Sequence, residues 1–282
     1  MSFSDILDIL FKLDYFVCLL IGFPLNILLI ILIIFKTPKE MKTHSRILIQ
    51  NCVLDILMLT CQLFLQVYYI LDTEGNTIHI IANGILLSFM KEDYNPFICN
   101  IVITFWKYIG VLNTHGLCVQ FIYRYLVLNR NKKINFLCYL FMLSISLFVT
   151  LFYVLDMYFF ITPYSNGGVK YFDNFNKSWP FIQYKMETIN VLSQLPVVLI
   201  EISAYSIIFI CGFKMAIVPF VNQAGVLFIM IFSETNNNIT NIIRILFFIN
   251  YHLTPVFNPI ICILTNTPYR NAIFNRSQVN PQ

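Results

Sequence analysis

The charged side chains that interrupt long apolar runs are the residues of this chain most able to do chemistry. Arg124 lies between Tyr123 and Tyr125, where an apolar run meets the basic segment 129–133. An isolated charge in an apolar environment is costly, so it is kept near an interface or paired. Two interpretations of Arg124 stay open at this point: a membrane anchor whose side chain reaches the surface, and a switch residue at a protein-binding face.

A second set of polar residues lies in the middle of other apolar runs. Asp55 is a carboxylate inside one such run, and Asn26, Asn258 and Pro259 lie in two more. A carboxylate away from water needs hydrogen-bond partners or a cation, and two amides are suitable partners. Pro259 removes a backbone donor and bends its helix. We predict that Asn26, Asp55 and Asn258 form one cluster, which acts either as a switch or as a static contact between helices.

Position alone suggests residues for a small-molecule pocket between helices. The candidates are Trp106, Lys107, Tyr108, His115 and His252. Ordinary packing is the commoner role for each of them, and Lys107 could instead pair with Asp156 or reach the interface. No nucleophile with a base and no cluster of metal ligands is evident in the sequence, so we expect neither an enzyme nor a cofactor.

The composition excludes an ordinary soluble protein. Apolar residues make up 58% of the 282 and charged residues 11%, and the mean hydropathy is +0.74. A soluble domain cannot bury that much apolar surface, so we predict an all-α membrane protein that crosses the bilayer several times. The lipid bilayer is then the first expected partner, and nucleic acid is not expected.

The apolar runs predict seven transmembrane helices in one domain. They cover about residues 13–35, 47–71, 97–126, 134–160, 191–210, 215–232 and 242–264, and a short tail follows at 265–282. The fifth and sixth spans come from one run that is too long for a single crossing, and Phe213-Lys214-Met215 is nearly their whole connection. We therefore expect a shortened sixth helix. The apolar segment 78–90 is too short to cross and is expected at the interface or against the bundle.

The distribution of charge predicts the orientation of these helices. With the N-terminus outside and the C-terminus in the cytoplasm, most lysines and arginines fall in inner segments, together with one acid, Glu40. This is the positive-inside pattern. The glycosylation sequons at Asn176 and Asn238 then lie in outer loops, where the modification can occur, whereas the sequon at Asn275 lies inside and should be unused.

Three segments carry a resemblance to a known family. They are Pro38 to Asp55, Phe121-Ile-Tyr-Arg-Tyr-Leu-Val-Leu128, and Asn258-Pro-Ile-Ile-Cys262 with Pro268-Tyr-Arg270. With seven predicted spans, the chain resembles the rhodopsin-like G-protein-coupled receptors and, more narrowly, the nematode serpentine chemoreceptors of class delta. The resemblance covers most of the chain.

The resemblance implies roles for the residues named above. Arg124 matches the arginine that faces the G protein in such receptors, although Tyr123 replaces its acidic neighbour. Asp55 matches an aspartate that can hold sodium, and Cys262 replaces a tyrosine of the seventh-helix motif. The expected partners are a small odorant or pheromone-like ligand and a heterotrimeric G protein. The expected location is the plasma membrane or the membrane of a sensory cilium.

Two other functions stay open. The short connection between the fifth and sixth spans is also what a receptor-like protein that cannot couple, or a truncated one, would show. A small transporter or channel is the third alternative. Such chains usually contain internal repeats or several charges within the membrane, and neither feature is evident here.

Overall fold

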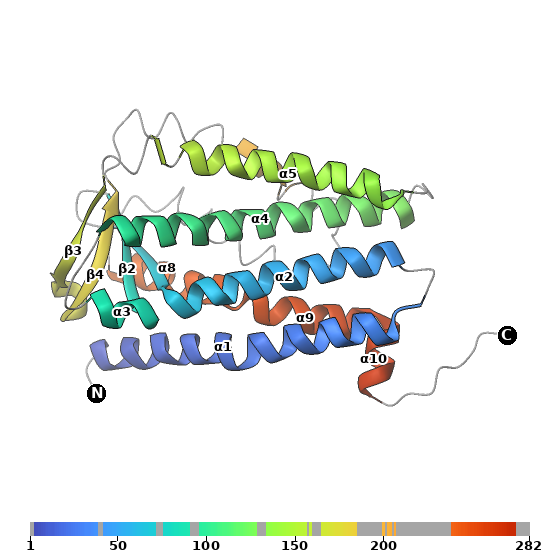
Figure 1. The fold of residues 1–282 in the computed structure, drawn as a ribbon. Coiled ribbons are helices and arrows are strands. Elements are labelled where there is room, and N and C mark those ends of the chain that lie inside the picture. Colours follow the sequence, from blue (N-terminus) through green and yellow to red (C-terminus); the bar gives the residue numbers. More distant parts are fainter. Residues whose placement is uncertain are drawn as a thin grey trace.

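The structure, a computed structural model, is dominated by long helices that lie side by side (Figure 1). It describes residues 3–38, 42–71, 76–90, 96–128, 134–156, 158–159, 165–184, 199–200, 202–204, 206 and 238–274. The long helices are α1 (Phe3–Lys36), α2 (Lys42–Phe64), α4 (Pro96–Leu128) and α5 (Phe136–Asp156). In the bundle α2 lies between α1 and α4, and α4 packs on α5.

The lengths and exposed faces of these helices suit a bilayer. Among the described residues, α1, α2, α4 and α5 are each long and apolar enough to cross, and a bent helix pair near the C-terminus adds a fifth span. Large apolar side chains point away from the bundle, with Leu20 on α1 70% exposed and Phe148 on α5 72% exposed. Such surfaces are unfavourable in water and favourable in lipid.

The bent pair consists of α8 (Asn238–His252) and α9 (Thr254–Thr265), whose axes meet at 48°. A short helix, α10 (Thr267–Ile273), follows and packs against α9 and α1. The N-terminus lies at the end of the bundle that carries a small sheet, and the C-terminus lies at the opposite end (Figure 1). α9 packs along α1 and α2.

A four-stranded antiparallel sheet covers one end of the bundle (Figure 1). The hairpin β1 (Gln66–Leu71) and β2 (Thr77–Asn83) follows α2, and the hairpin β3 (Ser165–Phe172) and β4 (Lys177–Tyr184) follows α5. The hairpins join because β2 pairs with β4, with Ile80 opposite Phe181. The strand order is therefore β1-β2-β4-β3.

Aromatic residues hold the sheet on the helices. Phe11 of α1 stacks on Tyr68 of β1 at 4.1 Å between ring centroids and meets the edge of Trp179 of β4 at 5.9 Å. Phe175 lies in the short 3₁₀ turn η4 (Asp173–Phe175) between β3 and β4, and it also packs on Trp179. Buried aromatic pairs of this kind stabilise beyond their buried area, so the sheet is a packed layer rather than a loose loop.

The helical fold is confirmed, and the sheet is an addition that we did not predict. The second span was expected to run to Leu71, but α2 ends at Phe64 and residues 66–71 form β1. That segment, Gln-Val-Tyr-Tyr-Ile-Leu, is β-branched and aromatic, which suits a strand. Likewise, the segment 78–90 forms most of β2 and then α3 (Ile85–Met90), packed on the bundle. The expected fifth and sixth spans and their connection lie outside the described residues, apart from a few positions between 199 and 206.

Gly84 makes the turn from β2 into α3 possible, which gives a test of the sheet's position. Its φ is +125°, and a Cβ there would lie 2.3 Å from the carbonyl oxygen of Phe64. We expect Gly84→Ala to lower the free energy of unfolding by more than about 1 kcal/mol. Gly168→Ala is the matched control because its Cβ would meet Phe181 at an ordinary 3.8 Å. Thermal unfolding of the purified variants measures both; equal melting temperatures would contradict the described turn.

Candidate functional site

The site is built around the break between α8 and α9, where prolines remove backbone donors. Pro255 has no N–H group, and the N–H of Val256 bonds to the carbonyl of Leu253 at 2.9 Å. The carbonyl of His252 is thereby released from the helix. It accepts hydrogen bonds from the Cys18 thiol and from Gln62 Nε2, both at 3.3 Å. Side chains of α1 and α2 thus supply the hydrogen bonds that the broken helix lacks at this carbonyl.

The second proline has the same effect one turn further on. Pro259 cannot donate to the carbonyl of Pro255, and Asn26 Nδ2 donates to that oxygen at 2.8 Å instead. Asn26 also donates to the carbonyl of Gly22 in its own helix at 2.9 Å, and it is fully buried. The sequence predicted Asn26 beside Asp55. The structure shows it bonded to the backbone of α9, so it joins α1 to the broken helix without a hydrogen bond to Asp55. The sharp bend lies at Leu253, while Pro259 lies inside α9.

The carboxylate of Asp55 joins three helices. Asn258 Nδ2 of α9 donates to both of its oxygens, at 3.0 and 3.2 Å, and Asn113 Nδ2 of α4 donates to Oδ1 at 2.8 Å. Asp55 is 2% exposed, so these amides replace the water that it has lost. Asn113 is the residue that sequence reasoning missed. The available signal was a lone amide inside an apolar run.

A cavity of about 80 Å³ opens beside Asp55 in the described part of the chain. Its polar lining comes from all three helices, and the rest is apolar. The polar lining residues are Asn51, Asp55, Gln120, Asn258 and Thr265. Asn113 Oδ1 and Asn51 Oδ1 are buried near this cavity without a hydrogen-bond partner. A cavity of this size has room for several water molecules, and such oxygens suit water or a hard cation.

The Tyr123-Arg124-Tyr125 triplet lies in α4, four residues before that helix ends at Leu128. Tyr123 is buried and meets the edge of the Tyr139 ring of α5 at 5.9 Å. Tyr139 in turn donates its hydroxyl to Gln50 Oε1 of α2 at 3.1 Å. The backbone at Arg124 is therefore held by a packed end of the bundle, on the side away from the sheet (Figure 1).

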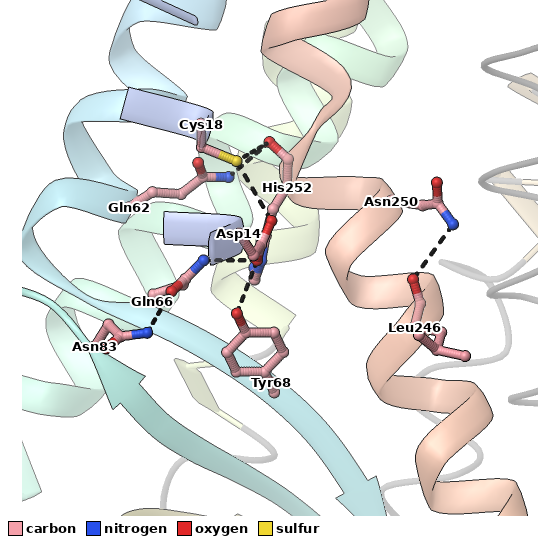
Figure 2. A network of polar contacts seen from close by, with 9 residues as sticks. All are labelled: Asp14, Cys18, Gln62, Gln66, Tyr68, Asn83, Leu246, Asn250 and His252. Carbon is pink, nitrogen blue, oxygen red and sulfur yellow. Dashed lines mark hydrogen bonds and ion pairs between the residues drawn. The ribbon is translucent and has the colours of Figure 1, made fainter. Parts of the chain in front are cut away.

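A second polar centre lies near the sheet, around the carboxylate of Asp14 in α1 (Figure 2). Its Oδ2 accepts from Gln66 Nε2 at 2.6 Å and from the Tyr68 hydroxyl at 2.7 Å, and His252 Nδ1 lies 2.8 Å away. Its Oδ1 accepts from the Cys18 thiol at 3.5 Å. Asp14 and His252 form an ion pair when the imidazole is protonated, and their side chains are 1% and 0% exposed. From the sequence, only His252 of this centre was named as a candidate, because the members are spread from α1 to α8.

The five residues suggested for a ligand pocket do not form one group. Trp106 and His252 lie together, with ring centroids 6.0 Å apart. The Lys107 ammonium lies over the ring of Tyr184, 4.8 Å from its centroid, and Tyr108 packs at the edge of the core under the sheet. His115 is separate, since its Nδ1 bonds to the Thr150 hydroxyl of α5 at 2.8 Å.

The two predicted glycosylation positions lie in different settings. Asn176 is exposed at the tip of the β3–β4 hairpin, in the left-handed conformation with φ +51°, and its Oδ1 accepts from the Tyr171 hydroxyl. Asn238 is the first residue of α8.

The fold and the site define a polytopic helical membrane protein whose spans are joined at polar centres. The family model of the serpentine type 7TM GPCR chemoreceptor Srd matches residues 11–213. The chain belongs to this family, which confirms the resemblance to serpentine receptor class delta and the seven-helix fold. The family is one of chemoreceptors and not an enzyme class. No curated protein matches the chain.

Asp14 offers a direct test of the centre near the sheet. Asp14→Asn removes the charge that faces His252 and replaces one of the two acceptor oxygens by a donor, so we expect it to cost about 3 kcal/mol of stability. Asp8→Asn is the control because Asp8 pairs with Lys177 at the surface, where a pair contributes about 1 kcal/mol or less. Thermal unfolding in detergent would measure both. Equal losses for the two variants would argue against a central role of Asp14.

Proposed function

We propose that this protein is a chemosensory receptor that detects a small external molecule, odorant or pheromone-like, and signals through a heterotrimeric G protein. The observation that carries the proposal is membership of the Srd chemoreceptor family, together with an arginine, Arg124, near the end of α4 that lies away from the sheet. A ligand that favours one packing of the helices would shift the population at that end. The expected location is the plasma or sensory-cilium membrane.

In this proposal Tyr123, Arg124 and Tyr125 face the G protein. Tyr123 stands where the resemblance implies an acidic neighbour of Arg124, so the sequence lacks that adjacent carboxylate. The polar centre at Asp55, with Asn258, Pro259 and the backbone contact of Asn26, is where the helices change their packing.

We further propose that Asp55 binds a sodium ion. Supporting observations are the cavity beside its carboxylate and the partnerless amide oxygens of Asn113 and Asn51. These residues would supply oxygen ligands, which a hard cation prefers. Within the described residues, no group of three or more His, Cys, Asp or Glu side chains could hold a metal ion. Sodium does not need such a group.

A receptor-like protein that cannot couple is the second candidate. The family match ends at Phe213, which is the start of the very short connection expected between the fifth and sixth spans. The match does not extend to residues beyond that point. A small transporter or channel remains a third and weaker alternative, because the family is one of receptors.

Signalling separates these candidates. We expect the full chain, expressed in cultured cells with a panel of G proteins, to raise basal nucleotide exchange above that of mock-transfected cells. Arg124→Ala should remove at least about nine-tenths of this signal, because the guanidinium is the proposed G-protein contact. Lys170→Ala, on an exposed part of β3, should leave it unchanged. Surface-expressed protein with no exchange under any condition would favour the coupling-deficient candidate.

Glycosylation tests the proposed orientation, with the N-terminus and the sheet outside and the C-terminus in the cytoplasm. Asn176 is exposed at a hairpin tip, which gives a glycosyltransferase access to it. We expect glycosidase treatment to increase the electrophoretic mobility of the wild type, and Asn176→Gln to reduce or remove that shift. Asn238→Gln measures how much of the mobility shift comes from a glycan at the other sequon. A glycan at Asn275 would instead place the C-terminus outside and reverse the orientation.

A further inference from the structure

A lysine lies within the bundle beneath the sheet with no counter-ion among the described residues. Lys107 belongs to α4, one turn after the buried Ile103, and its side chain is only partly exposed. Its ammonium rests over the Tyr184 ring of β4 at 4.8 Å. The attraction of a cation to an aromatic face is weaker than its pairing with an anion, so the ring does not replace a counter-ion.

The groups around Lys107 do not supply a negative charge. The Tyr184 hydroxyl is already committed, since it donates to Asn100 Oδ1 at 3.1 Å. His79 of β2 is buried, its ring meets the edge of Tyr184 at 5.3 Å, and its Nδ1 has no hydrogen-bond partner. Burial lowers the pKa of His79 well below its usual value and the Lys107 charge lowers it further, so His79 is neutral at pH 7.

Asp156, which the sequence suggested as an ion-pair partner of Lys107, does not pair with it. Asp156 lies at the last residue of α5, and no ion pair joins it to Lys107. One of its carboxylate oxygens is buried without a hydrogen-bond partner. Among the described residues, Lys107 therefore has an aromatic ring and a neutral imidazole beside it and no carboxylate paired with it.

We propose that Lys107 is the recognition residue for a small carboxylate-bearing ligand, whose anion pairs with the ammonium while its apolar part lies against the underside of the sheet. The pairing restores the missing counter-charge and forms a charge-assisted hydrogen bond. His79 Nδ1 is a second donor when the neutral ring carries its proton there. This inference rests on the proposed receptor function and adds to it the chemical class of the ligand.

The test measures binding directly, so that it does not depend on G-protein coupling. The purified full chain in phosphatidylcholine nanodiscs is titrated with acetate, hexanoate and decanoate, and with hexanol and decanol, while its melting temperature is followed. We expect hexanoate or decanoate to raise the melting temperature more than the alcohol of equal length does. In Lys107→Met the apparent affinity for the acid should fall about tenfold or more, and the advantage of acid over alcohol should disappear.

Two control variants distinguish a loss of ligand binding from a loss of folding. Lys107→Arg keeps the charge and should retain the preference for the acid, and Lys170→Met changes an exposed lysine of β3 and should behave as the wild type. The proposal is overturned if the wild type and Lys107→Met respond alike across the panel, whether both bind or neither does. Binding of the acid by a chain that is silent in the exchange assay would support this proposal and reject only the signalling function.

Discussion

The structure depends on side chains that donate hydrogen bonds to the free backbone carbonyls of a helix with two prolines, in a place without water. At the bend the N–H of Val256 bonds to Leu253 and leaves the carbonyl of His252 free, and Pro259 leaves the carbonyl of Pro255 without a donor. A backbone carbonyl left unpaired in a membrane costs several kcal/mol. The required donors come from other helices. Cys18 and Gln62 reach the carbonyl of His252, and Asn26 reaches that of Pro255. The break therefore exists only together with α1 and α2, and the three elements form one unit.

This unit separates two polar centres. The side chain of His252, the last residue of α8, belongs to the Asp14 centre near the sheet, and Asn258 of α9 belongs to the Asp55 centre (Figure 2). The two centres therefore lie on opposite sides of the same 48° bend, one at the end of α8 and the other on α9. A change in that bend has to rearrange hydrogen bonds in both centres, because neither carboxylate can be left without donors. The two polar centres are therefore connected through the residues on either side of this bend.

The spans were predictable because their length and hydropathy follow from the bilayer alone. The strands were not, since Gln66 to Leu71 continues the apolar run of α2 and only its pairing with β2 explains its extended form. Asp55 and Asn258 were predictable as a pair because each stands out in an apolar run. Asn113 and Asp14 needed the structure, because a single amide in α4 or a single acid in α1 does not show in sequence which residues it contacts. The change of partner at Asn26 is likewise visible only once the carbonyl freed by Pro259 is located.

The Asp14 centre sets the geometry of the bundle end that carries the sheet. A buried ion pair can often be replaced by apolar residues of similar volume without loss, so Asp14 and His252 need not add net stability compared with such a core. The pair does define the position of the His252 ring, because Tyr68 and Gln66 of β1 donate to the same carboxylate oxygen. The orientation of β1, and with it the sheet above Lys107, is therefore tied to the end of α8. Loss of this centre should loosen the sheet and the helix break together.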